Sequence, residues 1–161
     1  MAIKVGDKVP PGRLTVMKKD GPGALSTDEL FKDKKVVLFS VPGAFTPTCT
    51  KEHLPGFVKQ AQALKEKGID TIACMAVNDV FVMDAWGKSV GAGDKVLMLA
   101  DGNAEFTKAL GLTLDASGFG MGTRGQRFSM LVDNGTVKQL NVEEAAGQCK
   151  TSSAETLLAG F

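Results

Sequence analysis

Three short apolar runs, each followed by a segment with helical spacing, constrain the fold of this chain more than any other feature. They cover Val36–Val41, Ile72–Val77 and Val96–Ala100. Short apolar runs without polar alternation are typical of strands that are buried on both faces. A chain in which such strands alternate with helices is expected to form an α/β structure, with helices covering a sheet.

Helices are predicted where capping residues precede apolar residues at helical spacing. The longest of these patterns contains Pro55, whose missing N–H and bulky ring are expected to kink the helix. The first predicted helix begins at the Ser26–Glu29 capping box, and the second spans about Thr48–Lys67. The third runs from the Asn78-Asp79 cap to about Val90, and the fourth from the Asp101–Asn103 cap to Gly111. The last begins at the Ser152–Glu155 capping box.

A β-hairpin is predicted in the C-terminal part of the chain. Arg127–Val132 and Thr136–Val142 flank Asp133–Gly135, whose Asn-Gly pair is typical of a tight hairpin turn. The Gly-rich segment Ser117–Gly125 is expected to be a loop. Strand–helix units followed by a hairpin and a closing helix predict an α/β fold with a central mixed β-sheet flanked by helices. This order of elements is similar to that of the thioredoxin-like fold.

Length and charge argue against several classes of function. The chain has 161 residues, enough for a sizeable core, and we expect a single domain over residues 1–161. Lys plus Arg number 19 and Asp plus Glu 18, and this net charge of +1 argues against nucleic acid or a membrane surface as a partner. The opening residues Met1–Lys8 lack the apolar segment of a signal peptide, so we expect a cytoplasmic protein. Three widely spaced cysteines and one His fit neither a disulfide scaffold nor a zinc site.

The chemistry is expected at Cys49, in the segment Val41–Cys49 where a buried strand ends and the long helix begins. In a first helical turn, free backbone N–H groups and the positive end of the helix dipole stabilise a thiolate. Thr46 places a hydroxyl one turn earlier, able to donate to the sulfur or to a substrate. Pro47 suits the first helical position, which needs no N–H.

Two other roles stay open from the residues alone. Free cysteines are commonly buried and inert, so Cys49 would then be structural in a non-enzymatic binding or redox-sensing module. A thioredoxin-type disulfide oxidoreductase needs a second cysteine in a C-x-x-C arrangement, and here Thr46 stands at that position. A single thiolate can instead attack an oxidant directly and become a sulfenic acid.

The sequence resembles the peroxiredoxins through Pro42, Thr46 and Cys49, whose spacing matches that family's active-site motif. The wider context is similar to the type II subfamily, which includes the animal peroxiredoxin-five and the plant type II enzymes. The matching stretches are spread over nearly the whole chain. Beyond Val41–Cys49 they are His53–Phe57, Val77–Asp79, Ala85-Trp86, Leu99–Asp101 and Arg127–Met130.

The resemblance implies a role for each matching residue. Cys49 would be the peroxidatic cysteine, Thr46 would hydrogen-bond the peroxide, and Pro42 would shield the thiolate. Arg127 would lie beside the sulfur, stabilise its anion and help to polarise the O–O bond. A guanidinium suits this task because attack by the thiolate expels an alkoxide or hydroxide, which needs a fixed donor. Arg124, by contrast, is expected to be a solvated loop charge.

The other two cysteines are candidates for a resolving thiol. Cys149 lies in a polar stretch before the last helix, so we expect it to be exposed. The animal members place a resolving cysteine in the corresponding loop, slightly displaced in register, and a resolving or glutathionylation role stays open against an idle surface thiol. Cys74 is the weaker candidate, because it is expected inside a buried strand and a disulfide needs Cα atoms within about 7 Å. His53, four residues after Cys49, is expected to be solvated rather than part of a Cys/His dyad.

The resemblance also implies the reaction and the partners. It implies a thiol peroxidase that reduces hydrogen peroxide and alkyl hydroperoxides through a sulfenic acid on Cys49, without metal, haem, flavin or other cofactor. The reductant would be glutathione with glutaredoxin, or thioredoxin, and an external thiol is favoured over Cys149. Type II relatives are commonly homodimers, so large exposed aromatic residues are candidates for an interface. These residues are Phe45, Phe81, Trp86 and Phe119.

Overall fold

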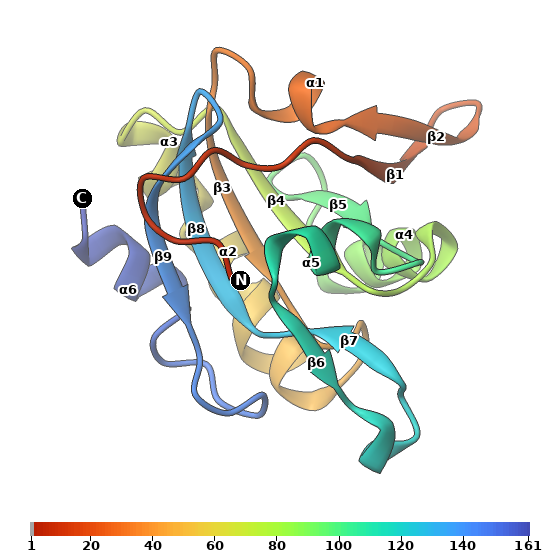
Figure 1. Cartoon of the computed structure of the whole chain (residues 1–161). Helices are drawn as coiled ribbons and strands as arrows, with labels where there is room; N and C mark the ends of the chain where they lie inside the picture. Colours follow the sequence, from red (N-terminus) through yellow and green to blue (C-terminus); the bar gives the residue numbers. More distant parts are fainter. Residues whose placement is uncertain (1) are drawn as a thin grey trace.

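The computed structural model describes residues 2–161 as a seven-stranded sheet with helices on both faces, beside a small two-stranded sheet (Figure 1). In spatial order, the strands of the large sheet are β2 (Gly21–Ser26), β1 (Arg13–Lys18), β5 (Leu97–Ala100), β4 (Thr71–Ala76), β3 (Lys35–Ser40), β8 (Phe128–Asp133) and β9 (Thr136–Val142). The small sheet pairs β6 (Thr113–Asp115) with β7 (Thr123–Gly125). The helical elements are α1 (Thr27–Phe31), the π-helical turn η1 (Cys49–His53), α2 (Leu54–Lys59), α3 (Ala61–Glu66), α4 (Val80–Val90), α5 (Glu105–Leu110), the 3₁₀ turn η2 (Ser117–Phe119) and α6 (Ala154–Ala159).

The large sheet is mixed, as predicted. Its centre is parallel, since β4 runs parallel to both β3 and β5. The outer pairs are antiparallel, with β8 beside β3, β9 beside β8, and β1 between β5 and β2. The predicted α/β fold with a central mixed sheet flanked by helices is therefore confirmed.

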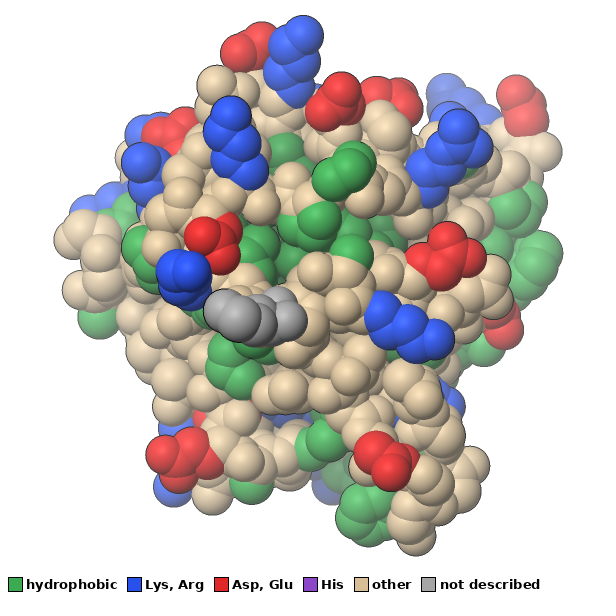
Figure 2. Space-filling view, in the orientation of Figure 1, with side chains coloured by type: hydrophobic (Ala, Val, Ile, Leu, Met, Phe, Trp, Pro, Cys, Tyr) green, Lys and Arg blue, Asp and Glu red, His purple; other side chains and the backbone are tan. Residues whose placement is uncertain are grey.

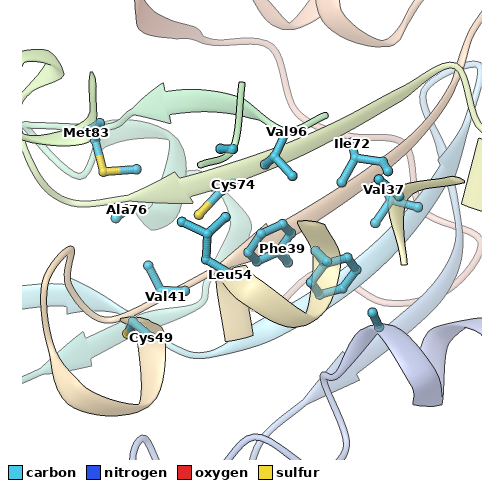
Figure 3. Packing of buried hydrophobic residues seen from close by; sticks show 14 of the residues in the cluster. Val37, Phe39, Val41, Cys49, Leu54, Ile72, Cys74, Ala76, Met83 and Val96 are labelled. Atoms are coloured by element: carbon cyan, nitrogen blue, oxygen red, sulfur yellow. The ribbon is translucent and has the colours of Figure 1, made fainter. Parts of the chain in front are cut away.

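Alternate residues of β3 and the segment after it pack into two hydrophobic clusters, one on each face of the sheet. Val37, Phe39 and Val41 belong to the cluster that includes residues of α2, α4 and α6, part of which is shown in Figure 3. Val36 and Leu38 belong to the cluster that includes residues of α1 and α5. Because burial of each such side chain contributes about 1.5–3 kcal/mol, β3 is firmly held on both faces. The segment that leaves its C-terminal end thus starts from a fixed position.

The long helix predicted over about Thr48–Lys67 is divided into η1, α2 and α3. Pro55 is the second residue of α2, which directly follows the π-helical turn. The turn before it is π-helical, with the Leu54 N–H donating to the Cys49 carbonyl. The chain breaks again at Gln60, with φ −94° and ψ 6°. The prediction of one regular α-helix is therefore wrong, and a π-turn, a feature that often marks functional sites, begins at Cys49.

The other predicted elements differ in detail. Strands β3, β4 and β5 agree with the predicted runs to within one residue at each end, and the capping box of α1 is formed. The capping box predicted at Ser152–Glu155 is wrong, because Ser153 caps α6 while the Ser152 hydroxyl donates to Glu143. The segment Ser117–Gly125 is not only a loop, since it contains η2 and β7.

Charged side chains of both signs are interspersed over the face seen in Figure 2, in agreement with the net charge of +1. Within residues 2–161, no helix has the length and apolar character needed to cross a membrane. Large apolar side chains on the surface are few and scattered. The exposed ones in this part of the chain are Val5, Phe45, Phe81, Leu97, Phe119 and Phe161.

Candidate active site

Cys49 is the first residue of η1, at the end of the loop that follows β3. Its side chain has no exposed surface and lies near Val41 in the core cluster (Figure 3). The loop is held to the segment after β4, because the Ala44 N–H donates to Oδ1 of Asn78 at 2.9 Å. Within the loop, Phe45 has a φ of 65°, a strained conformation for a bulky residue. The loop that leads to Cys49 is thus tied to the segment after β4.

Arg127 uses all three guanidinium nitrogens within the site. Its Nη2 donates to Cys49 Sγ at 3.0 Å, its Nη1 is 3.0 Å from Nδ1 of His53, and its Nε donates to the Ala146 carbonyl at 2.9 Å. Arg127 precedes β8, which lies antiparallel beside β3, so it comes next to the loop that leaves β3. The side chain is buried. A cation in contact with the sulfur favours the thiolate form of a cysteine.

His53 is buried against Arg127, so the expectation that it is solvated is wrong. Its Nε2 lies 3.0 Å from the Ser152 carbonyl oxygen, which can only accept, so Nε2 carries the ring hydrogen. Nδ1 is then free to accept from Arg127. Burial and the Arg127 charge lower the pKa of His53 to about 3, against the opposing effect of the Ser152 bond. The imidazole is therefore a neutral acceptor that orients the guanidinium.

Thr46 and Pro42 lie in the loop between β3 and η1. Thr46 Oγ1 donates to the Gly43 carbonyl at 2.6 Å, which leaves the hydroxyl oxygen free to accept. The Pro42 carbonyl accepts from Arg124 Nη1 at 3.4 Å, and Arg124 Nε donates to the Met121 carbonyl at 2.9 Å. Arg124 is half-buried, so the expectation of a solvated loop charge is wrong. It ties β7 to the loop that carries Thr46.

A pocket of about 280 Å³ lies beside these residues. Thr46 and Arg127 are among its polar lining, and Arg127 connects the pocket to the Cys49 sulfur. Its apolar lining comes largely from the loop before η1 and from the region of β6, η2 and β7. These apolar residues are Pro42, Pro47, Leu114, Ala116, Phe119 and Met121. The pocket thus offers a hydroxyl and a guanidinium to a small molecule that also contacts apolar walls.

Trp86 is not a surface residue. It is fully buried in the core cluster, and its indole N–H donates to Thr50 Oγ1 at 3.1 Å, which ties α4 to η1. Its assignment to an exposed aromatic patch is therefore wrong. Phe45, Phe81 and Phe119 are 54%, 64% and 85% exposed.

All three cysteines are free thiols in the described part of the chain. Cys74 is fully buried in β4, as expected, and burial together with the nearby Cys49 raises its pKa well above the usual value. Cys149 is half-buried in the loop between β9 and α6, rather than exposed as expected. Burial raises the pKa of Cys149 to about 11; Arg127 opposes this rise, and nearby carboxylates such as Glu143 add to it. Both thiols are therefore protonated at neutral pH.

The Redoxin family model matches residues 4–158 of this chain. A relative in Oryza sativa subsp. japonica, peroxiredoxin-2E-2, chloroplastic, is 51% identical over 97% of this chain and 71% of its own length. The chain belongs to the peroxiredoxin family. Peroxiredoxin-2E, chloroplastic, of Arabidopsis thaliana is 48% identical to this peroxiredoxin over 98% of the chain and 68% of the relative. A crystal structure of reduced Prx3 in complex with H₂O₂ from Vibrio vulnificus has a TM-score of 0.93 and 52% identity, with 98% of each chain covered.

These similarities confirm the resemblance to type II peroxiredoxins and, with it, the thioredoxin-like fold. This peroxiredoxin is a thiol peroxidase, an antioxidant oxidoreductase that takes a hydroperoxide as substrate and a thiol as reductant. A non-enzymatic binding or redox-sensing module is not favoured.

The expected cytoplasmic location is wrong as an inference from this sequence. Both plant relatives described above are named chloroplastic, and about half of their aligned residues are identical to those of this chain. The composition and the opening residues of a peroxiredoxin of this type therefore do not distinguish the cytoplasm from the chloroplast.

Proposed function

We propose that Cys49 is the peroxidatic residue of this thiol peroxidase, and that Arg127, Thr46 and Pro42 act on the sulfur and on the peroxide. The observation that carries the proposal is the 3.0 Å hydrogen bond from Arg127 Nη2 to Cys49 Sγ, made by a guanidinium that also lines the pocket. Such a cation acts on the nucleophile and on the substrate together. An inert core cysteine needs no partner of this kind.

In the proposed first step, the Cys49 thiolate attacks the terminal oxygen of ROOH and the O–O bond breaks. The sulfur bonds to that oxygen and is oxidised by two electrons to the sulfenic acid. The other oxygen leaves as RO⁻ and takes a proton from water to become ROH. Arg127 stays charged and donates to the oxygen on which negative charge develops.

Thr46 and Pro42 are proposed to prepare the peroxide and the sulfur for this step. Thr46 accepts a hydrogen bond from the peroxide O–H, since its own hydrogen is donated to the Gly43 carbonyl at 2.6 Å. Pro42 lines the same pocket and has no N–H to offer to water, so it shields the sulfur from solvent.

Hydrogen peroxide and alkyl hydroperoxides are the proposed substrates. Thr46 and Arg127 offer hydrogen bonds to the O–O group that the two substrates share. The apolar residues Leu114, Phe119 and Met121 suit the alkyl group of an organic hydroperoxide.

The sulfenic acid is proposed to react with an external thiol, R′SH, supplied by glutathione with glutaredoxin or by thioredoxin. The S–S bond forms to Cys49 and the hydroxyl leaves as water. Cys149 is the less favoured partner, because its pKa of about 11 leaves little thiolate at neutral pH. Cys74 is less favoured still, since it lies inside β4 between two paired strands.

A homodimer of single-domain chains is also proposed. One sheet with a core on each face supports a single domain over residues 1–161. The exposed Phe45, Phe81 and Phe119 are the proposed contact residues. Light scattering at micromolar concentration tests the association, and a monomeric mass would contradict it.

Stopped-flow mixing with hydrogen peroxide tests the central proposal. Without reductant, the parent protein should consume an amount of peroxide equivalent to its Cys49 and then stop. Cys49→Ser should consume none, whereas the matched variants Cys74→Ser and Cys149→Ser should keep this first step. Peroxide consumption by Cys49→Ser at the parent rate would show that the assignment is wrong.

A further inference from the structure

Glu143 has a buried carboxylate that none of the steps above uses. It directly follows β9, and its Oε2 accepts hydrogen bonds from the Lys150 N–H (2.8 Å), the Ser152 N–H (2.6 Å) and the Ser152 hydroxyl (2.6 Å). Residues 144–151, which we call the Cys149 loop, are thus closed at their base by one side chain.

The Cys149 loop and its last anchor, Ser152, are bonded to the active-site residues by carbonyl groups. The donors are three side chains at the active site: Arg127, which contacts Cys49, His53, which contacts Arg127, and Thr48, which directly precedes Cys49. The three bonds run from Arg127 Nε to the Ala146 carbonyl (2.9 Å), from Thr48 Oγ1 to the Gly147 carbonyl (2.8 Å) and from His53 Nε2 to the Ser152 carbonyl (3.0 Å).

We propose that Glu143 is a positioning residue that latches the Cys149 loop onto the Cys49 turn, favouring sulfenate formation and slowing the later reaction of the sulfenate with a thiol. The inference rests on the proposed peroxidatic role of Cys49. In the closed loop, the Ala146 carbonyl holds Arg127 Nε while Nη2 of the same rigid group donates to the sulfur. Cys49 is fully buried, and the loop is bonded to its neighbour Thr48 and to its partner Arg127, so opening of the loop should release the Cys49 turn and give a reducing thiol access.

The charge of Glu143 is what makes the latch strong. Hydrogen bonds to an ionised carboxylate are about twice as strong as those between neutral groups. Burial acts to raise the pKa of Glu143, but the bonds from the Ser152 hydroxyl and from the N–H groups of Ser152, Thr151 and Lys150 outweigh it and lower the pKa. A glutamine at this position keeps the size and one acceptor oxygen but loses the charge.

The closed loop also keeps the Cys149 thiol protonated and therefore unreactive. Its thiol is half-buried, and the Glu143 carboxylate is among the charges that raise its pKa to about 11. Opening the loop removes the burial, so attack on the sulfenate becomes easier both for an external thiol and for Cys149. Glu143 therefore acts in opposite directions on the two halves of the cycle.

The test separates those two halves by double-mixing stopped-flow in a Cys149→Ser background, which excludes the internal disulfide. The first mix, with hydrogen peroxide, gives the rate constant of sulfenate formation, and the second, with glutathione, gives that of sulfenate consumption. Trp86, the single tryptophan, bonds to Thr50 next to Cys49 and supplies a fluorescence signal. For Glu143→Gln, we expect formation to slow about tenfold and consumption by glutathione to quicken by about threefold or more.

Asp101→Asn is the matched control. Asp101 is also a buried carboxylate with three hydrogen bonds, but these come from Phe106 and Thr107 of α5.

Ser152→Ala removes one of the three bonds to Glu143 and keeps the Ser152 carbonyl that His53 uses. It should give smaller changes in the same directions, and it carries the test if Glu143→Gln does not fold.

Opposite changes in the two rate constants, absent from Asp101→Asn, would support the latch. Equal losses in both steps, changes matched by Asp101→Asn, or unchanged rates would overturn it. If the parent itself forms no sulfenate with peroxide, the proposed function fails instead, so the two failures are distinguishable.

Discussion

The neutral imidazole of His53 lies 3.0 Å from the buried guanidinium of Arg127 and accepts its hydrogen bond. Burial disfavours the charged imidazolium, and Arg127 would place a second positive charge against it, so the pKa of His53 is lowered to about 3. The Arg127–His53 contact thereby carries a single positive charge, and the guanidinium that carries it donates to Cys49.

Two substitutions of Arg127 distinguish the effect of its positive charge from the effect of its hydrogen-bond geometry. Arg127→Ala should slow sulfenate formation by about 10²–10³-fold, as expected for loss of a donor to a developing oxyanion. Arg127→Lys keeps the charge but cannot bond to Cys49, His53 and Ala146 together, so it should retain only a small part of the parent rate. Stopped-flow mixing with hydrogen peroxide measures both variants. A parent-like rate in Arg127→Lys would mean that a point charge suffices.

The lowered pKa of His53 predicts a loss of stability in acid. In the unfolded chain this residue binds a proton below its ordinary pKa of 6.5, whereas in the folded chain it stays neutral down to about pH 3. Between these values the unfolded state binds more protons, so the free energy of unfolding falls as the pH is lowered and levels off near pH 3. At pH 5, His53 should account for a loss of about 2 kcal/mol relative to pH 8.

Urea denaturation of the parent and of His53→Gln at pH 8 and pH 5 measures this effect. The glutamine keeps a hydrogen-bonding side chain but does not titrate, so its loss between the two pH values should be smaller than the parent's by that amount. Equal losses in the two proteins would show that His53 is not the group responsible.

Phe119 should affect substrate preference and not the chemical step. It lines the pocket at 85% exposure, whereas Phe81, at 64% exposure, is not part of the pocket lining. Phe119→Ser should raise the KM for a bulky alkyl hydroperoxide about tenfold, the cost of about 1.4 kcal/mol of lost apolar contact. The KM for hydrogen peroxide should not change, since that substrate needs only the polar lining. Phe81→Ser is the control, because any effect through dimer contacts would appear in it as well.

The central strands were predictable because burial on both faces selects unbroken apolar runs, and β3, β4 and β5 coincide with such runs. The position of Cys49 at the start of a helical turn was predictable from the strand that precedes it. The contact between Arg127 and Cys49 was not, because it depends on the pairing of β8 with β3 across most of the chain. No local spacing records that pairing, and only the family resemblance indicated it.

Polar residues with distant partners were the least predictable part of the site. His53 had one local signal, its spacing of four residues from Cys49, but its burial depends on Arg127 and Ser152. Arg124 and Glu143 have no local signal, since single charged residues in loops are usually solvated. Trp86 was misassigned for the converse reason: an isolated aromatic residue does not reveal whether its side of a helix faces the core or the solvent.

Cys149→Ser should leave turnover with glutathione and glutaredoxin unchanged. If an external thiol attacks the Cys49 sulfenate, the half-buried Cys149 takes no part in the exchange, and its thiol with a pKa of about 11 competes poorly. Intact-mass analysis of the parent after an equivalent of hydrogen peroxide gives the complementary readout. A sulfenic acid adds one oxygen atom, whereas a disulfide between Cys49 and Cys149 removes two hydrogen atoms. Rapid formation of that disulfide within the monomer, with thioredoxin as the effective reductant and slow turnover in Cys149→Ser, would contradict the external route and assign the resolving role to Cys149.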